Sequence, residues 1–217
     1  MKDASTENNQ VNSHKTTSDV ETVSCEKVYK GYFSVDKYVF RFRRFNGEMS
    51  APISREIFER GDAAAVIPYD PVRNEVILIQ QFRPGAAVRD KNTCWLNEIV
   101  AGIIDKGENP ETTVRRECME EAGIKLGKVM HAFDFYTTPG GSSEKISLFV
   151  GEADSSVASG IHGLKTEGED IRVFKVSFAK AMEMLEQGMF INSIAIAGLQ
   201  YLALHIDYIK KNLCNMR

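Results

Sequence analysis

The stretch GIIDKGENPETTVRRECMEEAGI, residues 102–124, carries both helix signals and an unusual set of acids. Asn109 followed by Pro110 predicts a helix start, because Asn is a favoured cap and Pro is favoured at the first helical position. Gly123 predicts the helix end, since Gly adopts the left-handed conformation that often follows a last turn. We therefore expect the first helix of the chain over residues 110–121. Its apolar stripe is Val114, Cys118 and Ala122, which are spaced four apart.

Three acids, Glu117, Glu120 and Glu121, are crowded into the last turns of this helix. Like charges at such spacing repel, and the partial negative charge at a helix carboxyl end also disfavours acids. One explanation is a solvated acidic face, with Arg116 pairing with Glu120 one turn away. The other is a set of oxygen ligands for Mg²⁺ or a similar hard cation, which would cancel the repulsion.

The spacing around these acids favours the metal-binding explanation. Reading from Gly102, five residues precede Glu108, seven more follow, and then comes RECMEEAGI, residues 116–124. This matches the Nudix box, G-x5-E-x7-R-E-U-x-E-E-x-G-U with U apolar, at every position. Seven fixed identities agree by chance on the order of 10⁻⁸ times per start point. The chain thus resembles a Nudix hydrolase, a family that uses divalent metals to hydrolyse a nucleoside diphosphate linked to another group.

The resemblance implies both a fold and residue roles. The implied fold is α/β, with the loop–helix–loop of the box on a Nudix α/β/α sandwich that has a mixed sheet. Arg116 would hold the acids, Glu120 would be their catalytic neighbour or a further ligand, and Glu108 would lock the loop. The implied metal ligands are Glu117, Glu121 and the backbone carbonyl of Ala101.

The composition is that of an ordinary globular protein. The chain has 217 residues, 43% of them hydrophobic, and a formal net charge of −3, which does not suggest a nucleic-acid partner. No apolar run reaches the length of a membrane span, and the N-terminus lacks the apolar core of a signal peptide, so we expect a cytoplasmic protein. The four cysteines are widely spaced, which argues against a zinc site or a disulfide framework.

The chain is expected to have three parts. Residues 1–24 are rich in polar groups and are predicted to be a flexible tail. Residues 25–60 alternate apolar and polar side chains, which predicts an antiparallel β region, and residues 61–217 form the hydrolase domain. The aromatic and arginine side chains of the β region could suggest RNA contact, but a sheet with a solvated or partner-facing side is favoured. In the hydrolase domain we expect strands at 63–70, 75–83, 95–102, 129–136, 145–152 and 171–176, a loop at 84–94, a helix after Ser177 and a last helix at 192–212.

Several segments narrow the resemblance to one subfamily. FERG, ILIQQFRPG, WLNEIVAG, TTPGGSSE, HGLKTEGEDIRV and INSIAIAGLQYLALH occur in this order and look like the ADP-ribose pyrophosphatases over roughly residues 28–208. This implies hydrolysis of ADP-ribose to AMP and ribose 5-phosphate with two or more Mg²⁺ or Mn²⁺ ions. GDP-mannose or a UDP-sugar is the alternative substrate. A non-catalytic nucleotide-sensing module would be expected to lose box acids, and here all are present; RNA-end hydrolysis would favour a basic surface.

The segment LKTEGEDI contains a second group of acids around Gly168. In isolation it would be an exposed acidic turn. Beside a metal site, a mobile carboxylate could close over the substrate and take a proton from water. The resemblance makes Glu167 this general base and places Glu169 on a metal.

The remaining candidates concern the substrate and a partner subunit. Gly140 and Glu144 of TPGGSSE are candidate substrate contacts, and Arg55 and Arg83 are candidates for the diphosphate, because guanidinium forms paired hydrogen bonds with phosphate oxygens. The subfamily is typically a homodimer in which the N-terminal strands pack across the partner. The segment YVFRFRRF, residues 38–45, fits this role, because one apolar face needs covering. We expect no nucleic-acid partner and no membrane association.

Overall fold

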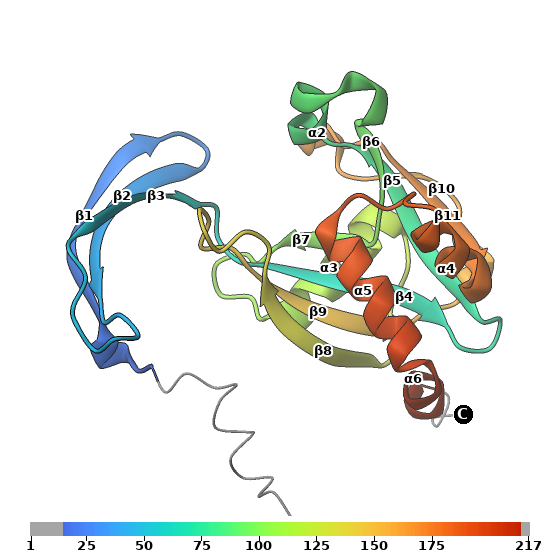
Figure 1. Ribbon diagram of the computed structural model, residues 1–217. Coiled ribbons are helices and arrows are strands. Elements are labelled where there is room, and N and C mark those ends of the chain that lie inside the picture. Colours follow the sequence, from blue (N-terminus) through green and yellow to red (C-terminus); the bar gives the residue numbers. More distant parts are fainter. Residues whose placement is uncertain (1–14, 214–217) are drawn as a thin grey trace, which may run out of the picture. The chain divides into compact units, whose positions relative to one another are not determined.

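The computed structural model describes residues 15–213 and divides the chain into two units (Figure 1). The N-terminal unit contains the described residues up to Arg60 together with Gly140–Ser143. The main unit contains Gly61–Pro139 and the chain from Glu144 onward. The box and most candidate site residues belong to the main unit.

The N-terminal unit is a three-stranded antiparallel sheet in the order β1-β2-β3. In this sheet Tyr38 lies opposite both Cys25 and Arg55. The rings of Tyr38 and Phe40 stack with centroids 5.2 Å apart. The strands are β1 (Val20–Lys30), β2 (Ser34–Phe42) and β3 (Ile53–Glu59), preceded by the short 3-10 helix η1 (Thr17–Asp19).

The sheet begins earlier in the chain than predicted. Of the tail predicted over residues 1–24, residues 1–14 lie outside the described residues, whereas β1 already begins at Val20. Val20 lies opposite Phe42 in the ladder, and Asp19 forms an ion pair with Arg43, with Oδ1 2.8 Å from Nε. Main-chain pairing and charge hold this strand, while all of its side chains are exposed. The polar composition of residues 1–24 was therefore a poor guide to the boundary.

The main unit is built on a mixed sheet with the strand order β10-β11-β5-β4-β9-β8. β4 and β9 are parallel, and the other neighbours are antiparallel. Two short strands extend the pairing, since β6 pairs with β5 and β7 pairs with β4. The bounds are β4 (Ala63–Asp70), β5 (Glu75–Phe82), β6 (Trp95–Glu98), β7 (Val100–Ile103), β8 (Val129–Tyr136), β9 (Lys145–Glu152), β10 (Gly160–His162) and β11 (Ile171–Ser177).

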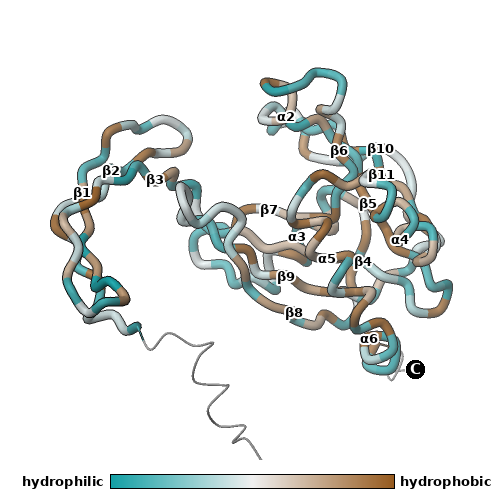
Figure 2. Tube along the Cα trace, viewed as in Figure 1, coloured by the Kyte–Doolittle hydropathy of each residue, from teal (hydrophilic) through white to brown (hydrophobic). Residues whose placement is uncertain are grey.

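Helices cover both faces of this sheet, as the alternation along β4 shows. Ala64 and Val66 pack in the core beneath α3 (Pro110–Ala122), through its buried residue Cys118. Ala65 and Ile67 point to the opposite core, which contains residues of α4 (Phe178–Glu186), α5 (Ser193–Leu204) and α6 (Ile206–Leu213). Figure 2 shows the hydrophobic character of these central strands. The predicted α/β/α sandwich with a mixed sheet is confirmed.

Three predicted elements differ in detail. The loop predicted over residues 84–94 contains α2 (Pro84–Arg89) and the 3-10 helix η2 (Lys91–Thr93), and the strand predicted over 95–102 is two strands. The helix predicted over 192–212 is divided into α5 and α6, because His205 leaves the helical conformation with φ −122° and ψ 16°. Two further 3-10 turns are η3 (Ser155–Val157) and η4 (Lys165–Glu167). Across residues 15–213, none of the helices combines the length and apolar character that a membrane crossing requires.

Candidate active site

Local signals define both ends of α3, the helix that carries most of the candidate residues. The Asn109 side chain accepts a hydrogen bond from the backbone N–H of Thr112 at 2.9 Å, and Pro110 occupies the first helical position. At the other end Gly123 is left-handed, with φ 66°, and its N–H bonds to the Met119 carbonyl at 3.0 Å. The predicted apolar stripe of α3 is buried against the sheet, so its acids are held in a fixed register above β7.

Glu121 is the most deeply buried acid of α3, with only 3% of its surface exposed. Its Oε2 accepts a hydrogen bond from the backbone N–H of Ala101 at 3.2 Å. Burial and the nearby charge of Glu117 raise the pKa of Glu121 to about 8. This carboxylate therefore carries a large desolvation cost that a bound cation would relieve.

Glu117 lies beside the same strand, at Gly102. Its carboxylate occupies the space that a Cβ on residue 102 would need, so a side chain at this position of β7 would displace the Glu117 carboxylate. Burial raises the pKa of Glu117, although Arg116 opposes the shift. Ala101 and Gly102 thus receive the two acids that are spaced four apart on α3.

Arg116 joins the acids of the box into one network. Its Nε and Nη2 donate to the two oxygens of Glu108 at 3.1 and 3.0 Å, and Nη2 also donates to the Ile103 carbonyl at 3.3 Å. Its Nη1 donates to Glu117 at 2.8 Å and to Glu120 at 3.0 Å. The bond from Arg116 holds the pKa of Glu108 down to about 2. One guanidinium therefore ties the loop before α3 to the acids at its end.

The loop after β10 places the other acid group next to the end of α3. The backbone N–H of Gly163 donates to the Glu120 carbonyl at 3.1 Å. Glu169 is half-buried, accepts a hydrogen bond from the Leu164 N–H at 2.9 Å, and its charge contributes to the raised pKa of Glu117 and Glu121. Glu167 ends η4 and is exposed. Both candidate acids of this loop therefore belong to a segment that is bonded to the last turn of α3.

The four candidate substrate residues fall into two groups. In the main unit, Arg83 follows β5 and forms an ion pair with the buried Glu98, with Nη2 2.6 Å from Oε2. Also in the main unit, Glu144 is buried and accepts a hydrogen bond from Thr137 at 2.9 Å. Arg55 and Gly140 belong to the N-terminal unit, and their roles stay predictions.

Comparison with known proteins identifies this arrangement. Residues 59–190 match the family model of the NUDIX domain, which is more than half of the chain. The chain belongs to the Nudix family. A solved structure described as an ADP compounds hydrolase has the same fold, with a TM-score of 0.69, 20% identity, and coverage of 90% of this chain and 98% of that one.

Two kinds of named enzyme are similar along most of this Nudix protein. An ADP-ribose pyrophosphatase from Escherichia coli is 49% identical over 192 residues, covering 88% of this chain and 91% of the relative. One from Haemophilus influenzae is 39% identical, covering 92% and 93%. A GDP-mannose pyrophosphatase from Pectobacterium atrosepticum is 34% identical, covering 85% and 94%.

The donor set of the Nudix site fits a hard divalent cation. Glu117 and Glu121 supply carboxylate oxygens, the ligand type that Mg²⁺ prefers, and Gly102 leaves the space in which one of them lies. Among residues 15–213, no three acidic, histidine or cysteine side chains form a complete metal-binding group by themselves. The fit therefore rests on the buried carboxylate pair, and further ligands would come from backbone, water, substrate or a rearranged Glu169.

Sequence reasoning missed two residues that contact Arg83 or its partner. Glu98 is only 2% exposed and lies on β6, and Asn192 bonds to it from the start of α5. The signal for Glu98 was an acid inside the otherwise apolar segment WLNEIVAG, because an acid is rarely buried without a charged partner. No local signal connects Asn192 to Glu98, because the two residues are 94 positions apart.

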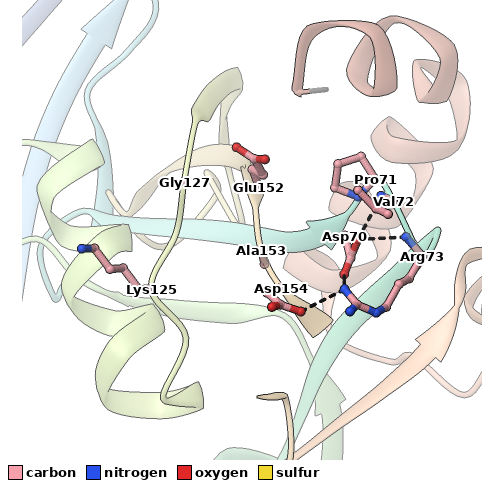
Figure 3. A pocket seen from close by; sticks show the side chains of 9 residues that line it. All are labelled: Asp70, Pro71, Val72, Arg73, Lys125, Gly127, Glu152, Ala153 and Asp154. Atoms are coloured by element: carbon pink, nitrogen blue, oxygen red, sulfur yellow. Dashed lines mark hydrogen bonds and ion pairs between the residues drawn. The ribbon is translucent and has the colours of Figure 1, made fainter. Parts of the chain in front are cut away.

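An open pocket elsewhere on the Nudix unit contains none of these residues (Figure 3). It lies where β4 and β9 end, and its wall includes Asp70, Arg73 and Asp154. Arg73 Nη1 lies 2.9 Å from Asp70 and 3.0 Å from Asp154, so these charges satisfy one another. The charged side chains of this pocket are therefore paired with one another, and we do not assign the pocket as a candidate catalytic site.

Proposed function

We propose that this Nudix protein hydrolyses the pyrophosphate bond of ADP-ribose to give AMP and ribose 5-phosphate, using two or more Mg²⁺ or Mn²⁺ ions. The observation that carries the proposal is the buried pair Glu117 and Glu121, held against β7 and adjoined by Arg116 and Glu169. The substrate is supported by the 49% identity to an enzyme named ADP-ribose pyrophosphatase, against 34% to one named GDP-mannose pyrophosphatase.

In this proposal the acids of α3 hold the cations. Glu117 and Glu121 would be the central ligands, joined by Glu169 and the Ala101 carbonyl, while Arg116 orients Glu117 and Glu120. When bound, the cations would polarise the attacking water and offset charge on the phosphate oxygens.

The remaining residues would handle the substrate and the proton. Glu167 accepts a proton as the water oxygen bonds to the adenosyl-side phosphorus. The bond from this phosphorus to the bridging oxygen breaks, and ribose 5-phosphate leaves. Arg83 and Arg55 would donate to the diphosphate oxygens, and Gly140 and Glu144 would contact the rest of the substrate.

A substrate panel tests the function. Purified protein is incubated with ADP-ribose, GDP-mannose or UDP-glucose, with Mg²⁺, with Mn²⁺ or with a chelator, and products are separated by anion-exchange chromatography. The proposal expects metal-dependent release of AMP, with ADP-ribose giving the highest kcat/KM. A higher kcat/KM for GDP-mannose would overturn the substrate while keeping the reaction, and no turnover of any compound would overturn the reaction.

We also propose that the protein is a homodimer formed through the N-terminal sheet. The support is apolar surface on β1, where Val23 is 49% and Tyr29 61% exposed in the single chain. Light scattering coupled to size exclusion tests this state. A monomer with full activity would contradict the proposal.

A further inference from the structure

Glu98 is a buried carboxylate that binds three side chains at once. Arg83 donates through Nε at 3.1 and 3.0 Å to the two oxygens and through Nη2 at 2.6 Å. Gln81 Nε2 donates at 3.2 Å and Asn192 Nδ2 at 2.9 Å. Both carboxylate oxygens are therefore occupied, and the guanidinium of Arg83 has a fixed orientation in its plane.

The Nη1 group of Arg83 does not take part in the contact with Glu98. This group makes no hydrogen bond within residues 15–213, and the side chain is 40% exposed. The charges of Glu121 and Glu169 act on the same guanidinium. Arg83 thus bonds to a buried acid through Nε and Nη2, is close enough to the candidate metal site to be influenced by the charges of two of its acids, and has an Nη1 group that is free to donate.

Asn192 contacts Glu98 from the start of α5, which packs on the face of the sheet opposite to α3. It is the N-cap of α5, and its Oδ1 accepts from the backbone N–H groups of Ile194 and Ala195 at 2.8 and 3.2 Å. Because the oxygen is committed to the helix end, the amide nitrogen must point at Glu98. The cap of α5 therefore bonds directly to the acid that holds Arg83.

Burying an ion pair costs desolvation free energy that the attraction between the two charges does not always offset. Apolar residues of similar volume are often as stable or more stable, so such a pair is weak support for a purely stabilising role. The pair instead supplies an oriented cation with unused donors at the edge of an acidic site. Planar Arg is the side chain suited to two phosphate oxygens at once.

We propose that Glu98 and Asn192 are positioning residues that hold Arg83 with its free N–H groups toward the diphosphate of the substrate. The inference rests on the proposed hydrolase function and adds a structural route from the cap of α5 to the phosphate-binding group. Neither residue touches the substrate in this account. Both act only through Arg83.

Asn192→Ser is the sharpest test, because Ser caps a helix about as well as Asn but cannot donate to Glu98 from the same place. We expect kcat/KM for the panel's best substrate to fall about tenfold to hundredfold, as for a displaced catalytic group, with the melting temperature nearly unchanged. Asn97→Ser is the matched control, since Asn97 is next to Glu98 and donates instead to the Met189 carbonyl at 3.2 Å. Asn97 also accepts a hydrogen bond from Gln80 at 3.1 Å but bonds neither to Glu98 nor to Arg83, so the variant should stay within about twofold of the wild type.

A double-mutant cycle separates positioning from general structure. Glu98→Gln should lower kcat/KM in the wild type but change it by less than about twofold when Arg83 is already Gln, since residues that act as a unit are not additive. Independent, multiplicative losses would overturn the inference, as would full activity of both Glu98→Gln and Asn192→Ser. In those cases the wild type still turns over the substrate, whereas an inactive wild type would overturn the proposed function itself.

Discussion

The backbone N–H of Gly163 donates to the carbonyl oxygen of Glu120 across 3.1 Å. This bond joins the loop that carries Glu167 and Glu169 to the last turn of α3. A second contact reinforces it, because the imidazole of His162 lies over Gly123 at the end of the same helix. The acids of the box and the acids of the loop, which are more than forty residues apart in sequence, therefore share one anchored boundary.

Replacing Gly123 by Ala should disturb this boundary. Gly123 has φ 66°, a left-handed conformation that is unfavourable for any residue with a side chain. An added Cβ would also come within 2.5 Å of His162 Cε1. We expect Gly123→Ala to lower the free energy of unfolding by about 1–2 kcal/mol, measured by urea denaturation. Gly85→Ala is the control, because a Cβ there meets nothing within 4 Å. Equal stability of the two variants would contradict the assigned contact.

Arg116→Lys should lower activity far more than Arg115→Lys. Arg116 reaches Glu108, Glu117 and Glu120 through different nitrogens, and a lysine ammonium cannot reproduce that fork. Arg115 lies beside it but pairs with the exposed Glu111. We expect kcat/KM to fall at least about tenfold for Arg116→Lys, because the acids lose their orientation, and to stay near the wild type for Arg115→Lys. Similar steady-state kinetics for both variants would show that the network is dispensable.

The start of α3 and its end were predictable because their signals are local. Asn109, Pro110 and Gly123 act within one turn of their own positions, and β4 and β5 are apolar runs between turn residues. The early start of β1 and the break at His205 were missed, because both depend on pairing and packing that no short window of sequence contains. The contact of Asn192 with Glu98 was missed for the same reason. The box acids were found through their spacing, while the grouping of Arg83 with Glu98 required the β5–β6 pairing.

The surroundings of Asp70 predict how the stability of the main unit changes at low pH. Asp70 is buried and accepts bonds from the backbone N–H groups of Arg73 and Ser155 at 2.9 and 3.0 Å. Burial alone would raise the pKa of Asp70, but these bonds and the Arg73 guanidinium hold it well below its usual range. The carboxylate therefore contributes stability above about pH 4 that is lost as the pH falls through the lower folded-state pKa.

Asp70→Asn makes this contribution measurable. At pH 7 the variant should be less stable than the wild type by about 1–3 kcal/mol, because buried donors lose a charged acceptor. The difference in unfolding free energy should shrink as the pH is lowered below about 4. Asp154→Asn should have a smaller effect, since that carboxylate is 62% exposed. A difference between the wild type and Asp70→Asn that is independent of pH would contradict the assigned ionised state.

Calorimetric titration with Mn²⁺ would measure whether the acids of α3 hold divalent cations. The wild type, Glu121→Gln and the control Glu111→Gln are titrated in the presence of AMP, a product of the proposed reaction. Glu111 lies at the exposed start of the same helix, and within residues 15–213 its carboxylate bonds to Arg115. We expect saturable Mn²⁺ binding by the wild type and by Glu111→Gln, and loss of at least one binding event in Glu121→Gln. Identical binding by all three proteins, or no binding by the wild type, would contradict cation binding by these acids.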